Sequence, residues 1–192
     1  MISVFKAFKS TLIFMVLAAG SLAVAGETYK VDASHSTIIF SVKHFNASNY
    51  YGRFNDFEGQ VQLGDDHSSF ELSVKAESLD THHEKRDKHL RGSDFFNAVQ
   101  FPEVTFKSTS IEKKADGGMT VSGDLTILGK TKQVTFQIVE VGAAKDPWGN
   151  YRRGFEGSGV IKRSDFGMNY GLEDGALGDE VRLLISLECI RS

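Results

Sequence analysis

The chain of 192 residues contains very little cysteine and proline, and these absences narrow the fold. It has one cysteine, Cys189, and two prolines. A lone cysteine excludes an internal disulfide, so stability has to come from packing and backbone hydrogen bonds. Because proline interrupts strands and helices, its scarcity favours long, unbroken elements. Fifteen phenylalanines against one tryptophan indicate a large aromatic interior.

Signatures of the common enzyme classes are also missing. The sequence has no G-x-S-x-G nucleophile elbow, no phosphate-binding P-loop, no C-x-x-C pair and no dinucleotide fingerprint. Cys189 lies on the apolar side of an alternating segment, so we interpret it as a buried small hydrophobe rather than a nucleophile. The formal charge of −3 removes the electrostatic basis for broad nucleic-acid binding. We therefore predict no catalytic residue, no cofactor and no nucleic-acid partner.

The N-terminal segment reads as a secretory signal peptide. Lys6 and Lys9 precede an apolar run over 12–19, and a small-residue A-x-A pattern ends at Ala25. The apolar run is shorter than the roughly 20 residues that a membrane span requires, so we expect no stable membrane insertion. Cleavage after residue 25 would leave a mature chain of residues 26–192. That cleavage removes two lysines and no acid, so the formal charge moves from −3 to −5.

Alternation of apolar and polar residues with a period of two dominates the chain after residue 35. In 36–45 (STIIFSVKHF), the residues Ile38, Phe40, Val42 and His44 fall on one face. The same pattern recurs at 57–63, 69–78, 103–108, 119–128, 132–141, 154–163 and 180–190. About eight strands with one helical interruption predict a single all-β domain, either an antiparallel barrel or a sandwich.

Glycines inside the predicted strands favour the barrel. Gly154, Gly157 and Gly159 lie in one strand-like segment, where glycine is typical of sharp bending or of close backbone approach. Such coiled strands close readily into a barrel. An eight-stranded barrel is wide enough either to be packed solid or to hold one ligand. The periodicity alone leaves both interiors open, because each needs an apolar lining.

The segment 81–96 (THHEKRDKHLRGSDFF) interrupts the strands with charge. Thr81 and Glu84 match a capping box, and Gly92 is placed to end a helix, so we predict a short surface helix over about 82–91. Leu90 is its only strong apolar residue, so the helix should lie on the barrel surface.

Three interpretations of this helix compete. His83-Glu84-x-x-Asp87 approaches the H-E-x-x-H zinc pattern, and an enzyme using a metal on 82–89 is the sharpest hypothesis. Asp87 in place of histidine and the surrounding cations weigh against it, so we predict no metal. The local excess of positive charge suits an anionic group instead. A merely solvated helix is the plainest alternative.

Two residues outside the helix are candidates for polar contacts. His44 ends the inward series of its strand, at the expected mouth of a cavity, although a hydrogen-bonded structural histidine fits equally well. Trp148 lies in a Pro-Gly loop (KDPWGNYRR), where it either covers a barrel end or touches a ligand.

Several stretches together resemble the YceI family of exported lipocalin-like proteins. They are YKVDASHSTIIFSVKHF, F-x-x-F-x-G at 54–59, THHEKRDKHLRGSDFF followed by FPEVTFKSTS, GDLTILGKTKQVTF and IKRSDFGM. They occur in the family's order from about Tyr29 to about Ile190. The resemblance implies an eight-stranded antiparallel lipocalin-like barrel, a periplasmic location and an apolar tunnel that binds a long polyisoprenoid or isoprenoid quinone. It implies no catalytic residue, and it favours a cavity over a solid core.

We therefore expect a non-catalytic carrier of an isoprenoid lipid. The expected tunnel residues are Phe40, Val42, Phe54, Val61, Phe106, Leu125, Phe136, Phe155, Met168 and Ile185. The expected polar residues at the mouth are His44, His83, Arg86 and Trp148. The alternatives are a binder of fatty acids or fatty amides, the metal-dependent enzyme, and an interaction module with a packed interior. A homodimer is an assembly that the sequence leaves open.

Overall fold

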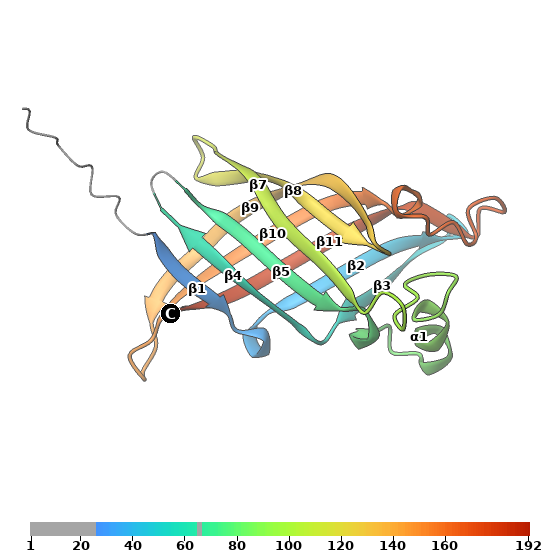
Figure 1. Cartoon of the computed structure of the whole chain (residues 1–192), viewed down its shortest axis with the longest axis horizontal. Helices are drawn as coiled ribbons and strands as arrows, with labels where there is room; N and C mark the ends of the chain where they lie inside the picture. Colours follow the sequence, from blue (N-terminus) through green and yellow to red (C-terminus); the bar gives the residue numbers. More distant parts are fainter. Residues whose placement is uncertain (1–25, 65–66) are drawn as a thin grey trace, which may run out of the picture.

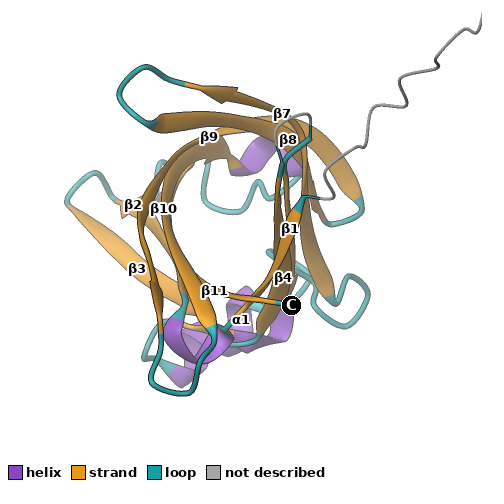
Figure 2. Cartoon of the chain, turned by 90° about the vertical axis from the view of Figure 1, so that its left-hand side faces the viewer, coloured by secondary structure: helices purple, strands orange, loops and turns teal. Residues whose placement is uncertain are grey.

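The period-two segments form long antiparallel strands that close into a barrel (Figures 1 and 2). The computed structural model describes residues 26–64 and 67–192. The predicted signal peptide, residues 1–25, lies outside the described residues. Within them, no helix has both the length and the apolar character to cross a membrane.

Eleven strands and a few short helices make up the described chain. The strands are β1 (Glu27–Val31), β2 (Thr37–His44), β3 (Ser48–Phe54), β4 (Phe57–Leu63), β5 (Ser69–Lys75), β6 (Leu79–Asp80), β7 (Glu103–Lys113), β8 (Gly118–Ile127), β9 (Lys130–Lys145), β10 (Tyr151–Lys162) and β11 (Leu177–Arg191). The α-helix α1 is Glu84–Leu90, and the 3₁₀ helices are η1 (Ala33–His35), η2 (Ala76–Ser78) and η3 (Arg163–Phe166).

These strands occupy eight positions around the barrel, which confirms the predicted fold class. Three positions are each shared by two consecutive strands: β1 with β2, β3 with β4, and β5 with β6. From β5 the ring continues through β7, β8, β9 and β10 to β11, and every pairing is antiparallel. Strand β11 closes the ring because it pairs with β2 over its first part and with β1 at its end. The apolar alternation did not predict β1, β3 and β6, because they are short or lack a clean alternation.

The two ends of the barrel differ. At the mouth end, on the right of Figure 1, lie the β2–β3 turn (residues 45–47), α1 and the β10–β11 connection (residues 163–176). At the closed end, on the left, lie the start of β1, the β9–β10 turn (residues 146–150) and the end of β11. Figure 2 looks onto the closed end and shows the strands as a ring.

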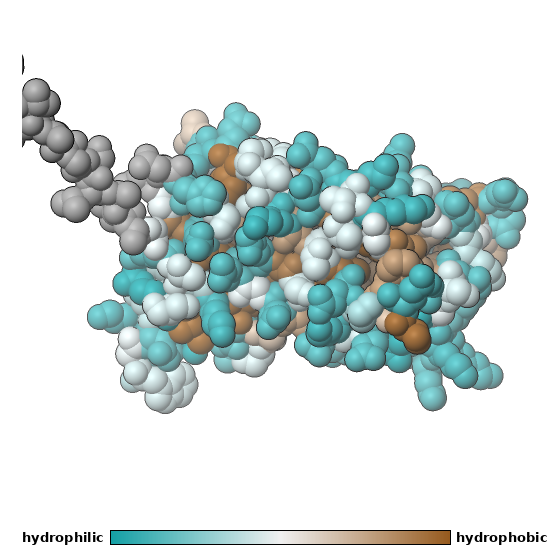
Figure 3. Space-filling model, in the orientation of Figure 1, coloured by the Kyte–Doolittle hydropathy of each residue, from teal (hydrophilic) through white to brown (hydrophobic). Residues whose placement is uncertain are grey.

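Alternate side chains of the strands point inward and form the core. Phe70 and Phe155 meet edge to face with ring centroids 5.5 Å apart, and Phe106 and Phe136 do so at 5.2 Å. The outer face shown in Figure 3 is largely hydrophilic, with hydrophobic residues scattered over it. Cys189 is fully buried, as predicted, and burial raises the pKa of its thiol to about 12. A thiol with that pKa stays protonated and unreactive near neutral pH.

Glycine is required where β3 passes beside β2. A Cβ atom on Gly52 would lie 2.3 Å from the ring of Phe40 and 2.8 Å from Thr81. Both neighbours are packed, so any larger residue would displace them. This close approach lets the Phe40 ring point into the barrel.

Arg163 holds the β10–β11 connection in place. Its side chain is buried, and it donates hydrogen bonds to the carbonyls of Met168 (2.8 Å), Tyr170 (2.8 Å), Leu177 (3.0 Å) and Gly178 (2.8 Å). Burial lowers the pKa of this guanidinium, which nevertheless remains charged at any ordinary pH. The planar fork of arginine satisfies several carbonyls at once, and both ends of the connection are thereby tied to one residue.

Replacing Arg163 should therefore destabilise the barrel strongly. We expect Arg163→Met to lower the free energy of unfolding by about 3 kcal/mol, because buried carbonyls lose their donors. Arg163→Lys should recover less than half of this, since lysine lacks the fork. Urea unfolding measures both, with the half-exposed Arg53→Met as a control that should change stability by less than about 0.5 kcal/mol. Equal losses of stability on replacing Arg163 and Arg53 would contradict the role of Arg163 in holding the β10–β11 connection.

Candidate functional site

The barrel interior contains an apolar cavity of about 440 Å³. Its lining comes from β2, β3, β5, β7, β8, β9, β10 and β11, and from α1 and the loops at the mouth end. Most lining side chains are aromatic or aliphatic, so the space suits a hydrocarbon. Nine of the ten predicted tunnel residues line it: Phe40, Val42, Phe54, Phe106, Leu125, Phe136, Phe155, Met168 and Ile185.

The tenth predicted tunnel residue, Val61, does not line the cavity. It is buried, at 1% exposure, and pairs with Tyr29 on β1 and Phe70 on β5. Tyr29, Val121 and Cys189 are likewise fully buried without lining the cavity. The interior is therefore packed solid toward the closed end and hollow toward the mouth end. The site is a one-mouthed cavity rather than an open tunnel.

Arg86 is the main charged group at the cavity that keeps free donors. Its Nε donates to the Thr81 hydroxyl (2.8 Å) and its Nη2 to the Thr81 carbonyl (2.7 Å). Its guanidinium carbon lies 4.6 Å from the centroid of the Tyr50 ring, a cation–π contact. Among the described residues no carboxylate pairs with Arg86, and Nη1 has no hydrogen-bond partner there. Arg86 can therefore donate to a polar group at the end of a ligand.

Histidines and aromatic rings complete the mouth. His44 lines the cavity and packs edge to face against Phe45 (4.4 Å) and Tyr50 (4.6 Å). Across the opening, Tyr170 packs against His89 at 5.0 Å and against Phe95 at 5.2 Å. The contact between Tyr170 and α1 brings the β10–β11 connection against the helix and narrows the mouth.

The predicted capping box on α1 is wrong. His83, not Thr81, is the N-cap, and its Nδ1 accepts from the Arg86 amide at 3.3 Å. Thr81 is buried instead, and its amide (2.9 Å) and hydroxyl both donate to the Asp87 carboxylate. Gly92 does not adopt a left-handed conformation. This arrangement orients Thr81 and Arg86 toward the cavity, which a conventional cap at Thr81 would not do.

The possible metal site on α1 is not assembled. Asp87 turns its carboxylate toward Thr81, and the His83 ring caps the helix. His83 also does not line the cavity, which corrects its prediction as a residue of the polar mouth. Of the predicted polar residues, His44 and Arg86 lie at the mouth.

Trp148 was also predicted at the polar mouth, but it lies at the closed end. Its side chain is 81% exposed at the tip of the β9–β10 turn. The Asp146 carboxylate organises this turn by accepting from the amides of Trp148 (3.0 Å) and Asn150 (2.9 Å) and from the Asn150 side chain (2.8 Å). The turn therefore holds its shape far from the cavity.

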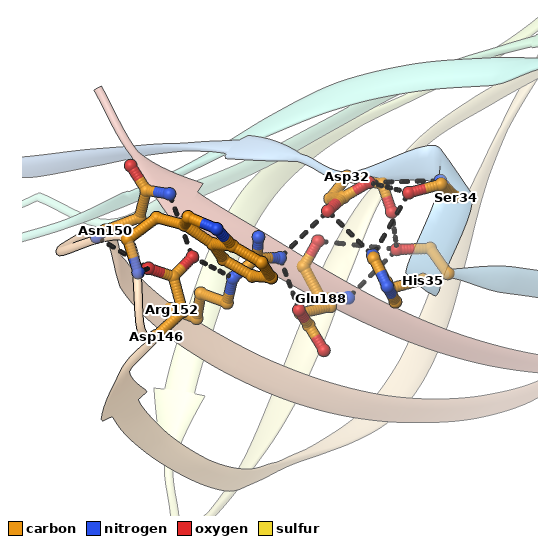
Figure 4. A network of polar contacts seen from close by, with 9 residues as sticks. Asp32, Ser34, His35, Asp146, Asn150, Arg152 and Glu188 are labelled. Atoms are coloured by element: carbon orange, nitrogen blue, oxygen red, sulfur yellow. Dashed lines mark hydrogen bonds and ion pairs between the residues drawn. The ribbon is translucent and has the colours of Figure 1, made fainter.

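A network centred on Arg152 ties this turn to the barrel (Figure 4). Its guanidinium donates to Asp146 (2.9 Å), Asp32 (2.8 Å) and Glu188 (2.5 Å). The three acceptors belong to the turn, the β1–β2 bend and β11. Asp32, Glu188 and His35 could together ligate a metal ion, but the cationic Arg152 already occupies the space between the two carboxylates.

These contacts shift the pKa values of the network. Burial acts to raise the pKa of Asp146, but hydrogen bonds from Asn150 and Arg152 outweigh it and hold the pKa at about 2. The Ser34 hydroxyl and Arg152 hold the pKa of Asp32 well below its usual range. The same carboxylates raise the pKa of Arg152.

The sequence patterns did not predict four residues of the site: Tyr50, His89, Tyr170 and Arg163. Tyr50 lies in a strand without alternation, and His89 lies in a helix that was interpreted from its charge. Tyr170 lies in the part of the β10–β11 connection after η3, which forms no helix or strand. Arg163 and Met168 both lie in IKRSDFGM, one of the stretches that carry the family resemblance. The arginine in that stretch could therefore have been predicted as a site residue.

Comparison with known proteins finds relatives of the whole barrel. Residues 29–189 match the family model described as YceI-like domain. A UPF0312 protein from Pseudomonas aeruginosa (strain LESB58) is 41% identical over 192 residues, covering 95% of this chain and 98% of its own.

Solved structures of other proteins share the fold. The Campylobacter jejuni YCEI protein is 31% identical with a TM-score of 0.71, covering 78% of this chain and 90% of its own. A polyisoprenoid binding domain from Saccharophagus degradans has a TM-score of 0.66 over 85% of this chain and 98% of its own. At 15% identity it is similar in fold alone.

The closed-end network should make stability fall in acid. A carboxyl whose pKa drops from 3.8 in the unfolded chain to about 2 in the folded one stabilises the fold fully above about pH 5 and not at all below pH 2. We expect Asp146→Asn to be less stable than the natural chain at pH 7, with the difference shrinking to zero between about pH 4 and pH 2. Urea unfolding across this range measures it. A difference in unfolding free energy that does not depend on pH would contradict the stabilising role of the Asp146 charge.

Proposed function

The chain belongs to the YceI-like family, and on that premise we propose that it is a non-catalytic binding protein holding a long isoprenoid lipid in its cavity. The observation that carries the proposal is the cavity: apolar, about 440 Å³, packed shut at one end and open at the other. Each methylene moved from water into such a space contributes about 0.8 kcal/mol. An isoprenoid chain can therefore bind tightly with little help from its polar end.

The isoprenoid class draws support from the fold. The Saccharophagus degradans domain that shares the barrel is described as polyisoprenoid binding. The nine cavity-lining residues predicted from the sequence would contact the chain, and no cofactor is needed. A fatty acid or fatty amide fits the same apolar space, and only ligand identification separates these classes.

The polar end of the ligand would meet Arg86 and His44. Arg86 has free donors and no acceptor, so it suits an oxygen-bearing group such as a hydroxyl, a quinone carbonyl or an acid. With a cleaved signal peptide, the protein would work as a carrier in the periplasm, where a long isoprenoid has negligible solubility in water.

The first test is denaturing extraction of the purified protein followed by lipid mass spectrometry. We expect one apolar molecule per chain, and we expect Gly157→Leu to reduce it about tenfold or more, because a Cβ at 157 has room and the rest of the leucine fills the cavity. Ser158→Leu adds the same side chain to the exposed outer face of β10 and should retain the ligand. An empty extract from the natural chain, together with no binding of added isoprenoid, would rule out the carrier.

A second test concerns Arg86. We expect the natural chain to bind an isoprenoid alcohol more tightly than a hydrocarbon of the same length, by about 1–3 kcal/mol, and Arg86→Met to lose this preference. Hydrocarbon affinity, measured by competition with a fluorescent lipid, should stay within about twofold. If Arg86→Met weakened both ligands equally, the arginine would be structural only.

A further inference from the structure

Phe45, in the β2–β3 turn at the mouth, has an energetically unfavourable backbone conformation and an exposed side chain. Its side chain is 62% exposed and its φ is +48°, in the left-handed region that bulky residues avoid. The next residue, Asn46, has φ +53°, so the turn needs two left-handed residues in succession. Asparagine or glycine suits such a position far better. A strained, exposed phenylalanine is the kind of feature that folding alone does not select.

Phe45 belongs to a rim of exposed aromatic side chains around the mouth. Its amide donates to the Ala176 carbonyl at 2.9 Å, so the turn is fastened to the β10–β11 connection. That connection carries Tyr170, a residue that is 50% exposed. Both residues also line the cavity. The exposed aromatic surface is therefore continuous with the apolar interior.

Lysines follow the same rim. Lys43 precedes the turn, and Lys85 and Lys88 lie on α1; among the described residues, no carboxylate pairs with any of the three. The rim carries acids too, including Glu173 and Asp174, so its net charge is not strongly positive. Attraction by charge alone would be weak, and the aromatic residues must supply most of any contact.

We propose that the mouth end docks on the surface of a lipid bilayer, with Phe45 and Tyr170 inserted at the level of the headgroups. Tyrosine, with its hydroxyl, and lysine, with its long stem, prefer this interface, and an apolar phenylalanine ring inserts at the boundary between headgroups and acyl chains. The alternative occupant, a protein, generally needs a continuous buried face of about 800 Å² on each partner. Isolated rings between charged residues match a bilayer better. Docking would place the mouth of the cavity against the bilayer, so that a lipid could pass between the two without crossing water. This purpose rests on the proposed function.

The single tryptophan makes the orientation measurable. Trp148 lies at the closed end and should remain in water when the mouth end docks. The double variant Phe45→Trp/Trp148→Phe moves the only tryptophan to the rim. We mix each protein with vesicles of phosphatidylethanolamine and phosphatidylglycerol that contain spin-labelled lipid. Quenching of the rim tryptophan should exceed that of Trp148 by about fivefold.

A matched pair of substitutions tests the contribution of the rim. Phe45→Asn removes the aromatic ring and places a residue that tolerates positive φ, so the unfolding midpoint should not fall. We expect it to reduce the vesicle-bound fraction in flotation about fivefold or more. Trp148→Asn removes an exposed aromatic ring at the closed end and should leave binding within about twofold.

The proposal is overturned if the natural chain does not float with vesicles, if Trp148 is quenched as strongly as a tryptophan at 45, or if Phe45→Asn binds as well as the natural chain. Attachment through the segment before β1 would quench Trp148, because β1 begins at the closed end. Lipid extraction remains a separate test: docking without extractable lipid would refute the carrier function alone, and lipid without docking would refute this inference alone.

Discussion

Closure of the ring by β11 is the constraint on which the rest of the structure depends. This strand pairs with β10 along most of its length and with β2 and β1 in turn on its other side. A closed ring leaves no long sheet edge inside the barrel and satisfies the backbone without disulfides. The interior is then free to hold any apolar filling, whether side chains or a ligand. The same closed ring therefore contains both the packed part of the interior and the cavity.

The two ends use arginine in different ways. Arg152 joins three carboxylates at the closed end, and Arg163 joins carbonyls of the β10–β11 connection. Arg86 differs from Arg152 because it lines the cavity, and its Nη1 has no partner among the described residues. An N–H donor left unpartnered at an apolar cavity is available to a ligand. This contrast, more than overall charge, identifies the polar side of the site.

The face toward which each strand residue points could be read from the sequence, but its depth could not. Period-two alternation correctly grouped Phe40 and Val42, and it also selected Val61, which is buried beside the cavity-lining Phe70 but does not itself line the cavity. Depth depends on strand register and tilt, which leave no local pattern. Trp148 was misplaced for the same reason. The helix was predicted in the right region, but its predicted cap was wrong, because Thr81 bonds to Asp87. Both residues are buried, and burial leaves no local sequence pattern from which this pairing could be predicted.

A cavity with one mouth also sets the order of events in exchange. Under the proposed function, a bound chain would leave by the opening through which it arrived, so an incoming molecule could not push the resident one out from behind. Release would then have to precede uptake. The barrel by itself has no inlet and outlet, and therefore no built-in direction. Net movement of a ligand between two locations would follow the difference in its chemical potential between them.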